Sequence, residues 1–188
     1  KREKELIDLL DKHRSKDGSW DCIVPSSHGK DSALVAHQLK DQYGMHPLTV
    51  TWAPFIYTKI GWLNFFNMTQ KGFDGLTAWP NGITHRKLAR VGFEVKGDPF
   101  EAFVNGQKAY PFQVAWKFKI PLIFYGENGE VEYGGSFKNV DKSHESPEDW
   151  EEEYYKGVGF DKVLEIGNEM GIISDKELKE GCFDFYRA

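Results

Sequence analysis

Apolar and polar positions along the chain form short blocks that predict helices and buried strands in alternation. Residues 2–13 carry apolar side chains at helical spacing and predict an amphipathic helix. Residues 20–24 and 48–52 are short apolar runs bounded by turn residues, which predict two buried strands. A helical pattern at residues 33–40 separates these strands. The order strand, helix, strand predicts an α/β fold with a parallel sheet flanked by helices and right-handed crossovers.

The rest of the pattern is mainly helical. Further helices are expected in five places, at residues 58–70, 83–95, 100–118, 160–170 and 175–180. The third of these helices should be interrupted near Pro111. The apolar run 120–125 predicts another buried strand, which ends at Gly126. Residues 139–153 carry a dense group of carboxylates, and we interpret them as an exposed loop that enters a helix.

Composition narrows the classes of protein that the chain can represent. A length of 188 residues with 40% hydrophobic content suits one domain spanning residues 1–188. Because the chain begins with Lys1 rather than Met, we expect a fragment of a longer protein. The net charge of −5 gives no general basic face for nucleic acid. Neither an apolar run of about 18 residues nor a signal peptide occurs, and two cysteines cannot build a disulfide framework, so a cytoplasmic location without membrane contact is expected.

The polar segment 25–32, between the first strand and its helix, carries the clearest chemistry. A loop that opens a helix directs backbone N–H groups and the positive end of the helix dipole at a ligand. Ser27 and Ser32 add hydroxyl groups, Gly29 permits close approach, and Lys30 supplies a positive charge. The pattern favours a phosphate ligand. The alternative is an ordinary turn capped by Asp31 or Ser32.

The sequence Ser27-His28-Gly29-Lys30-Asp31-Ser32 resembles the Ser-Gly-Gly-x-Asp-Ser loop of the N-type ATP pyrophosphatases, or PP-loop ATPases. The resemblance implies an adenine nucleotide alpha hydrolase-like fold, with ATP bound by all six residues and Mg²⁺ as cofactor. It also implies catalytic roles for Lys30 and Asp31, the latter as a metal ligand. His28 departs from this pattern, since the family has its first glycine there. A position with positive φ would explain the glycine, and His28 would then crowd the phosphate.

Later segments resemble the N-acetyl sugar amidotransferases of surface-polysaccharide and lipopolysaccharide (O-antigen) biosynthesis. The segments that carry this resemblance are Phe73-Asp74, Pro80-Asn81-Gly82, His85-Arg86-Lys87-Leu88, Gly97-Asp98-Pro99-Phe100, Gly106-Gln107-Lys108 and residues 125–135. Members of this family use ATP to convert the acetamido group of a nucleotide-linked sugar to an acetamidino group. The resemblance implies a separate glutaminase and a cyclase-like ammonia-channelling subunit as partners. It also implies zinc in a segment that precedes this domain.

Other candidate residues follow the predicted strands. Thr51 and Trp52 end the second strand, where the resemblance implies contacts to adenosine, although Trp52 also suits the core. Gly126, a nucleotide-binding candidate, follows the strand at 120–125. Glu127 and Asn128 come next and should project into the crevice at the carboxyl ends of the strands. We assign Glu127 a catalytic role. Asn128 and Glu130 are substrate-binding candidates in the same loop, for which a simple Asn-Gly turn is the alternative.

Three polar residues where a loop enters the helix at 83–95 complete the candidates. Asn81, His85 and Arg86 would contact substrate, with Arg86 paired to a carboxylate or diphosphate; solvated surface side chains are the alternative. Cys22 is interpreted as a core residue. Two other functions remain open for the whole chain. One is a tRNA-modifying PP-loop ATPase, and the other is a nucleotide-binding module that has lost catalysis through His28.

Overall fold

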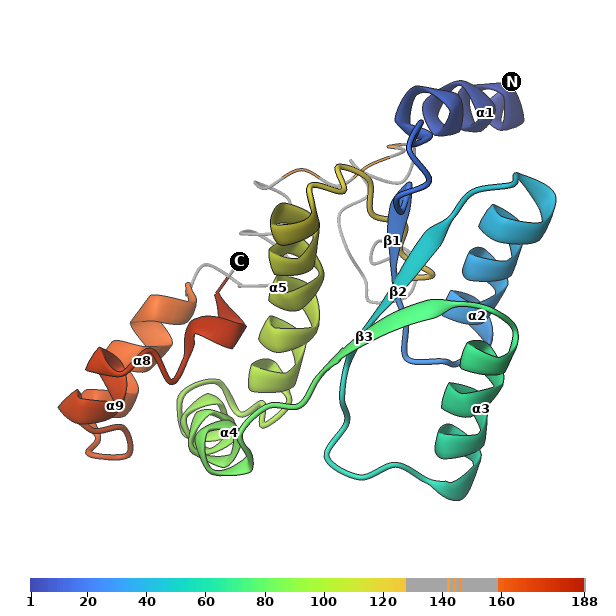
Figure 1. Ribbon diagram of the computed structural model, residues 1–188. Coiled ribbons are helices and arrows are strands. Elements are labelled where there is room, and N and C mark those ends of the chain that lie inside the picture. Colours follow the sequence, from blue (N-terminus) through green and yellow to red (C-terminus); the bar gives the residue numbers. More distant parts are fainter. Residues whose placement is uncertain (128–141, 143, 145, 147–158, 188) are drawn as a thin grey trace. The chain divides into compact units, whose positions relative to one another are not determined.

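The computed structural model (Figure 1) describes residues 1–127, 142, 144, 146 and 159–187. These residues fall into two compact units. The first unit contains Lys1–Trp79 and Gln107–Gly126, and the second contains Pro80–Gly106 and Glu127–Arg187. The sequence was interpreted as one domain. Among the described residues, no helix combines the length and the apolarity needed to cross a lipid bilayer.

A parallel three-stranded sheet with the order β1-β2-β3 forms the centre of the first unit. The strands are β1 (Cys22–Pro25), β2 (Pro47–Trp52) and β3 (Asp74–Ala78). The register pairs Ile23 with Leu48 and Leu48 with Asp74. The predicted α/β class with a parallel sheet flanked by helices is therefore confirmed.

The segment at 120–125 lies on the other side of β1 from β2. Ile23 accepts a hydrogen bond from the backbone N–H of Phe124 and donates one to the carbonyl of Leu122, both at 2.8 Å. Only Ile23 and Ile123 form a parallel bridge, so the predicted strand is limited to this single contact. β1 therefore has β2 on one side and the segment around Ile123 on the other. From β1 the chain continues to β2, and it returns to the opposite side of β1 only at Ile123.

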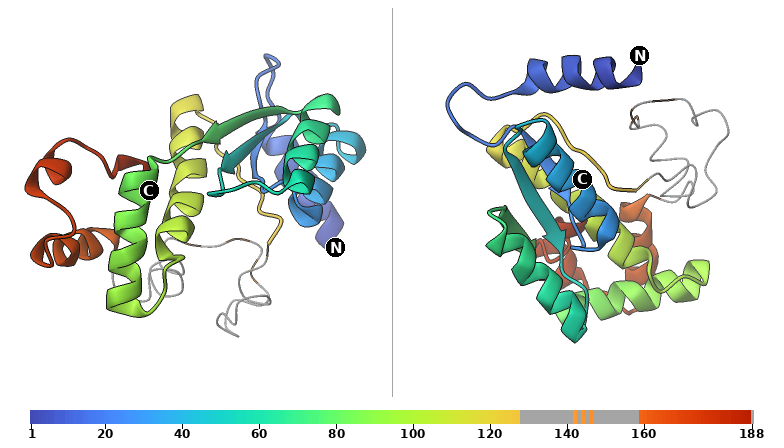
Figure 2. Two further views of the ribbon diagram at one scale, coloured as in Figure 1. Left: turned by 90° about the horizontal axis from the view of Figure 1, so that it is seen from below. Right: turned by 90° about the vertical axis from the view of Figure 1, so that its right-hand side faces the viewer.

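Helices cover both faces of the sheet (Figures 1 and 2). The helices of the first unit are α1 (Arg2–His13), α2 (Lys30–His37) with a π-helical continuation (Gln38–Gln42), α3 (Lys59–Gln70) and the later part of α5 (Glu101–Phe118). The predicted interruption of α5 near Pro111 is wrong, since the helix continues through this residue. Pro111 removes one backbone donor, and the buried neighbours Ala109 and Val114 hold the helix in place.

The core of the first unit has two halves because side chains alternate along a strand. Cys22 and Val24 point to one face and pack with residues of α1, α2 and α3, including Leu10, Ala36 and Met68. Ile23 points to the opposite face, where it packs with Leu48 and Val50 of β2 and with Val114 of α5. This burial fixes the end of β1, from which the loop of residues 26–29 leaves.

The second unit is helical in its described part. It contains α4 (Gly82–Lys96), the start of α5, α8 (Phe160–Glu169), α9 (Asp175–Lys179) and a 3₁₀ turn (Asp184–Tyr186). Helix α8 approaches α4 closely at Gly167, where a Cβ would lie 2.9 Å from Val91 and 2.8 Å from Ile173. Any larger residue at Gly167 would push these elements apart.

Candidate functional site

The loop between β1 and α2 lies at the carboxyl edge of the parallel sheet. β1 ends at Pro25 and α2 begins at Lys30, so residues 26–29 form a short turn above the strand ends. The neighbours of β1 are β2 on one side and Ile123 on the other. In open α/β sheets, ligands bind where the chain leaves neighbouring strand ends in opposite directions. The loop occupies that position.

Serine hydroxyl groups form hydrogen bonds within the loop and to the first turn of α2. The hydroxyl of Ser26 accepts a hydrogen bond from the backbone N–H of His28 and donates one to Ser32 Oγ, both at 3.1 Å. Ser27 Oγ accepts from the N–H of Gly29 at 3.3 Å. Ser26 and Ser32 are buried, whereas Ser27 is exposed. Sequence reasoning missed Ser26, although its place at the end of a buried strand is a usable signal.

No side chain caps the first turn of α2. Its N-cap residue is Gly29, with φ −79° and ψ 176° and without a side-chain hydrogen bond to the helix amides. The Asp31 carboxylate instead lies 2.7 Å from Lys30 Nζ, and the Ser32 hydroxyl lies 3.4 Å from the carbonyl of Gly29. The alternative of a turn capped by Asp31 or Ser32 is therefore not the observed arrangement. First-turn amides without a cap favour an anion above them.

His28 adopts a backbone conformation that favours glycine. Its φ is +60°, in the left-handed region, where histidine is one of the better tolerated residues. The side chain is buried, and its ring meets the Phe65 ring of α3 edge-on with centroids 4.8 Å apart. Burial lowers the pKa of His28. Nδ1 is buried and has no hydrogen-bond partner among the described residues, an environment that favours the neutral ring over the charged one.

Gly126 packs directly against the backbone of the first turn of α2. A Cβ at this position would lie 2.7 Å from the backbone nitrogen of Ser32 and 2.8 Å from its Cα. Such distances are too short for any side chain, and the obstacle is backbone, which cannot rotate away. The structure therefore brings two predicted site residues, Gly126 and Ser32, into direct contact.

The residues assigned to adenosine lie inside the first unit. Thr51 and Trp52 are both buried at the end of β2. The Trp52 ring packs near Tyr110 of α5, with centroids 6.3 Å apart. This packing agrees with the core interpretation of Trp52. The exposed residues that follow them, Phe55 and Ile56, are nearer to solvent.

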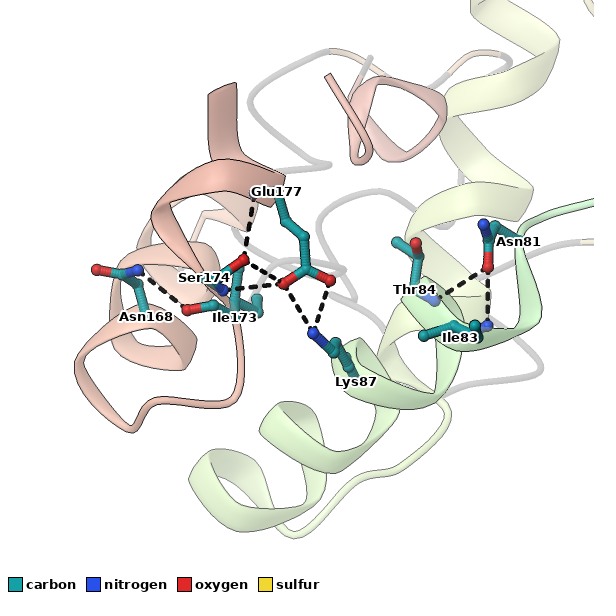
Figure 3. Close-up of polar contacts among 8 residues, drawn as sticks. All are labelled: Asn81, Ile83, Thr84, Lys87, Asn168, Ile173, Ser174 and Glu177. Carbon is teal, nitrogen blue, oxygen red and sulfur yellow. Dashed lines mark hydrogen bonds and ion pairs between the residues drawn. The ribbon is translucent and has the colours of Figure 1, made fainter. Parts of the chain in front are cut away.

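The three candidates of the second unit have different environments. Asn81 caps α4, with Oδ1 accepting from the N–H of Ile83 at 2.9 Å and from that of Thr84 at 3.4 Å (Figure 3). His85 is 1% exposed, and its Nδ1 lies 2.8 Å from the hydroxyl of Tyr186. Burial lowers the pKa of His85 and raises that of Tyr186. His85 is thus interior, contrary to the expectation of a side chain that faces solvent or substrate, whereas Arg86 is exposed.

The carboxylates and cysteines complete the description. Glu127 is exposed, while Asn128 and Glu130 lie outside the described residues. Within the described ranges, no three His, Cys, Asp or Glu residues form a group suited to a metal ion. Asp31, the predicted metal ligand, is exposed and paired with Lys30.

Burial raises the pKa of Cys22 to about 12, as expected for a core residue rather than a nucleophile.

Sequence reasoning also missed a buried cation beside the site. Lys108 is 8% exposed, and its Nζ lies 4.4 Å from the centroid of the Tyr125 ring, next to Gly126. A lysine between the small buried residues of α5 was the available signal, since a charged residue on an apolar helix face is unusual. Lys108 therefore joins the site residues of the first unit.

No family model matches the chain, and the search of curated proteins found no significant match.

Proposed function

We propose that the chain is an ATP-dependent, AMP-forming amidotransferase of the PP-loop type that acts on a nucleotide-linked acetamido sugar. The resemblance of Ser27–Ser32 and of the later segments motivates this function. The observation that supports it most is the uncapped first turn of α2, placed at the sheet edge and closed by the contact of Gly126 with Ser32. That arrangement suits a ligand with phosphate groups.

In the proposed reaction, the acetamido oxygen attacks the α-phosphorus of ATP. The bond between that phosphorus and the bridging oxygen breaks, and pyrophosphate leaves with the electron pair. Ammonia then adds to the adenylated imidate carbon and displaces AMP, which carries away the former acetamido oxygen. The acetamidino group retains the new nitrogen.

The residues of the chain would act mainly by positioning and charge stabilisation. The first-turn amides of α2 and the Lys30 ammonium would hold the departing pyrophosphate. Lys30 Nζ lies 2.7 Å from Asp31, and both side chains are largely exposed, so little free energy opposes their separation when phosphate binds. Asp31 offers an oxygen ligand of the kind Mg²⁺ prefers, and bound Mg²⁺ would neutralise charge on the phosphates.

Ammonia would come from a separate glutaminase through a channelling subunit. Helix α3 supports the proposal of a partner, because it exposes Ile60, Leu63 and Phe66 on one helix. Contiguous exposed apolar side chains are typical of protein-binding surfaces.

A second candidate function is a nucleotide-binding module without catalysis. The left-handed φ and the buried ring of His28 are the specific observations that favour this second function. The two functions differ in turnover rather than in ATP binding.

The test supplies the full-length protein with ATP, Mg²⁺, ammonium and an acetamido sugar nucleotide. We expect AMP and pyrophosphate to form only when the sugar is present, together with an amidine product visible by mass spectrometry. Release of ADP and phosphate would reject the loop chemistry. AMP formation with tRNA instead of sugar would favour the tRNA-modifying alternative, and ATP binding without any product would favour the non-catalytic module.

A further inference from the structure

The second unit contains a basic pocket that the proposed ATP chemistry does not use. It has a volume of about 480 Å³, within the range of small-molecule sites. Its lining comes from α4 and from the turn after α8, namely Ile83, Arg86, Lys87, Arg90, Gly171 and Ile172. Three of these six residues are cations and none is acidic, although Lys87 and Arg90 each have a carboxylate partner outside the lining.

Arg86 and Arg90 are the cations with donors left for a ligand. They are four residues apart on α4 and therefore lie on the same face. Arg86 uses Nε to contact the carbonyl of Gly82 at 3.2 Å, and Arg90 uses Nε to contact Glu94 at 2.6 Å. Within the described ranges, neither guanidinium has a protein partner at its two terminal nitrogens.

Lys87 has a structural role at the same pocket. Its Nζ lies 2.6 and 2.7 Å from the two carboxylate oxygens of Glu177 on α9 (Figure 3). Lys87 and the hydrogen bonds from Ser174 lower the pKa of Glu177 to about 2. The charge of Lys87 is therefore neutralised, and the pair ties α9 to α4 beside the pocket. Arg90 also forms an ion pair, with Glu94, but this pair is more exposed to solvent and leaves the two terminal nitrogens of the guanidinium for a ligand. Arg86 has no carboxylate partner within the described ranges and carries most of the attraction for an anion.

We propose that Arg86 and Arg90 clamp the diphosphate of the nucleotide-linked sugar in this pocket, an inference that rests on the proposed function. Guanidinium groups match phosphate oxygens with two parallel hydrogen bonds. A lone carboxylate needs only one such group, whereas two guanidiniums one helical turn apart suit two linked phosphates. Ile83 and Ile172 add apolar walls for the attached sugar or base.

The experiment titrates the full chain with inorganic pyrophosphate and follows backbone amide signals by NMR. In the wild type we expect two responses, one at Gly171 and Ile172 and one at Gly29 to Ser32. The double variant Arg86→Gln/Arg90→Gln should weaken the first response by about tenfold or more and leave the second unchanged. The control Lys71→Gln/Lys117→Gln removes the same charge from exposed positions of the first unit and should change neither.

The variants separate this inference from the proposed function. Lys30→Ala should weaken only the loop response. If pyrophosphate binds the pocket but does not bind the loop at all, the proposed ATP chemistry is rejected and the arginine clamp stands. Equal pocket affinity in the wild type and the arginine variant, with both folded by circular dichroism, would overturn the clamp. UDP-N-acetylglucosamine should displace pyrophosphate from the pocket more effectively than ATP, and the opposite order would overturn the assignment of the ligand.

Discussion

The first turns of α2 and α4 both follow a parallel strand, yet they differ in how their amides are used. At α4, Asn81 accepts hydrogen bonds from two first-turn amides. At α2, Gly29 has no side chain to accept hydrogen bonds from the first-turn amides, and the carboxylate of Asp31 forms an ion pair with Lys30 instead. Thr58 of α3 and Ser174 of α9 cap their helices as Asn81 does.

Under the proposed function, this difference separates a helix start that serves stability from one that serves binding. A cap satisfies the amides permanently and stabilises the helix. A glycine leaves the same groups to be satisfied by water or by a ligand, at a small cost in stability. A helix start after a strand is therefore a binding site only when its own side chains leave the amides open.

The largest effect is expected from Gly126→Ala, which would force apart the two segments that form the loop site. The new Cβ would lie 2.7 Å from the backbone nitrogen of Ser32, and overpacking of this kind lowers the free energy of unfolding by about 3 kcal/mol. ATP affinity should fall as the first turn of α2 shifts. Urea denaturation and calorimetry measure the two quantities. Gly82→Ala is the control, because nothing lies within 4 Å of its Cβ; equal stability of the two variants would contradict the close contact.

The next effect concerns the lysine that begins each of two helices. Lys30 is the first residue of α2 and Lys59 is the first residue of α3, where Thr58 provides a cap. Lys30→Ala should weaken ATP binding by about 2 kcal/mol, since it removes a charged contact to phosphate. Lys59→Ala should leave ATP affinity unchanged. If calorimetry finds the same loss in both variants, the effect is general electrostatics and the α2 site is misplaced.

A smaller effect should follow from exchanging the two kinds of helix start. Asn81→Ala should lower the free energy of unfolding by about 1 kcal/mol without changing ATP affinity. Gly29→Asn should alter stability by only a few tenths of a kcal/mol, because glycine is itself a fair N-cap. Its side-chain oxygen would compete with phosphate for the amides, so ATP should bind more weakly. Gly29→Ala controls for the added Cβ, and an equal loss of ATP affinity in Gly29→Ala and Gly29→Asn would rule out competition by the cap.

The smallest effect is a dependence of stability on pH. Burial lowers the pKa of His28 and His85 in the folded chain, so below the ordinary histidine pKa of about 6.5 the unfolded chain binds more protons. Stability is therefore fully present above that pH and falls as the pH decreases below it. One bound proton corresponds to about 1.4 kcal/mol per pH unit, and each histidine supplies a fraction of this slope.

Urea denaturation between pH 7.5 and 5.5 measures this slope. His28→Asn suits the comparison, because asparagine also tolerates the positive φ of this position. The variant should lose less stability on acidification than the wild type. Identical slopes would mean that His28 does not contribute, and that its burial is too incomplete to favour the neutral ring.

The sequence alone was sufficient for β1, β2, the loop between β1 and α2, and the places of the helices, except for the interruption expected in α5 at Pro111. Their apolar periodicity and turn residues are local properties, and local patterns report which face of an element is buried. The same information missed β3. Asp74 and Gly75 are exposed at its start, and the strand forms because its backbone groups pair with β2, from Leu48 onward.

The tertiary structure decided which candidates meet and which are buried. Sequence reasoning proposed Ser32 and Gly126 separately, whereas their contact depends on the approach of the Ile123 segment to β1. It proposed His85 as a substrate-binding residue, with a solvated side chain as the alternative, whereas the structure buries His85 and pairs it with the hydroxyl of Tyr186. It proposed Arg86 without Arg90 or the pocket that both line. Local sequence determined the helices and the strands β1 and β2, while open amides, burial and contacts between distant residues depend on packing that no local pattern contains.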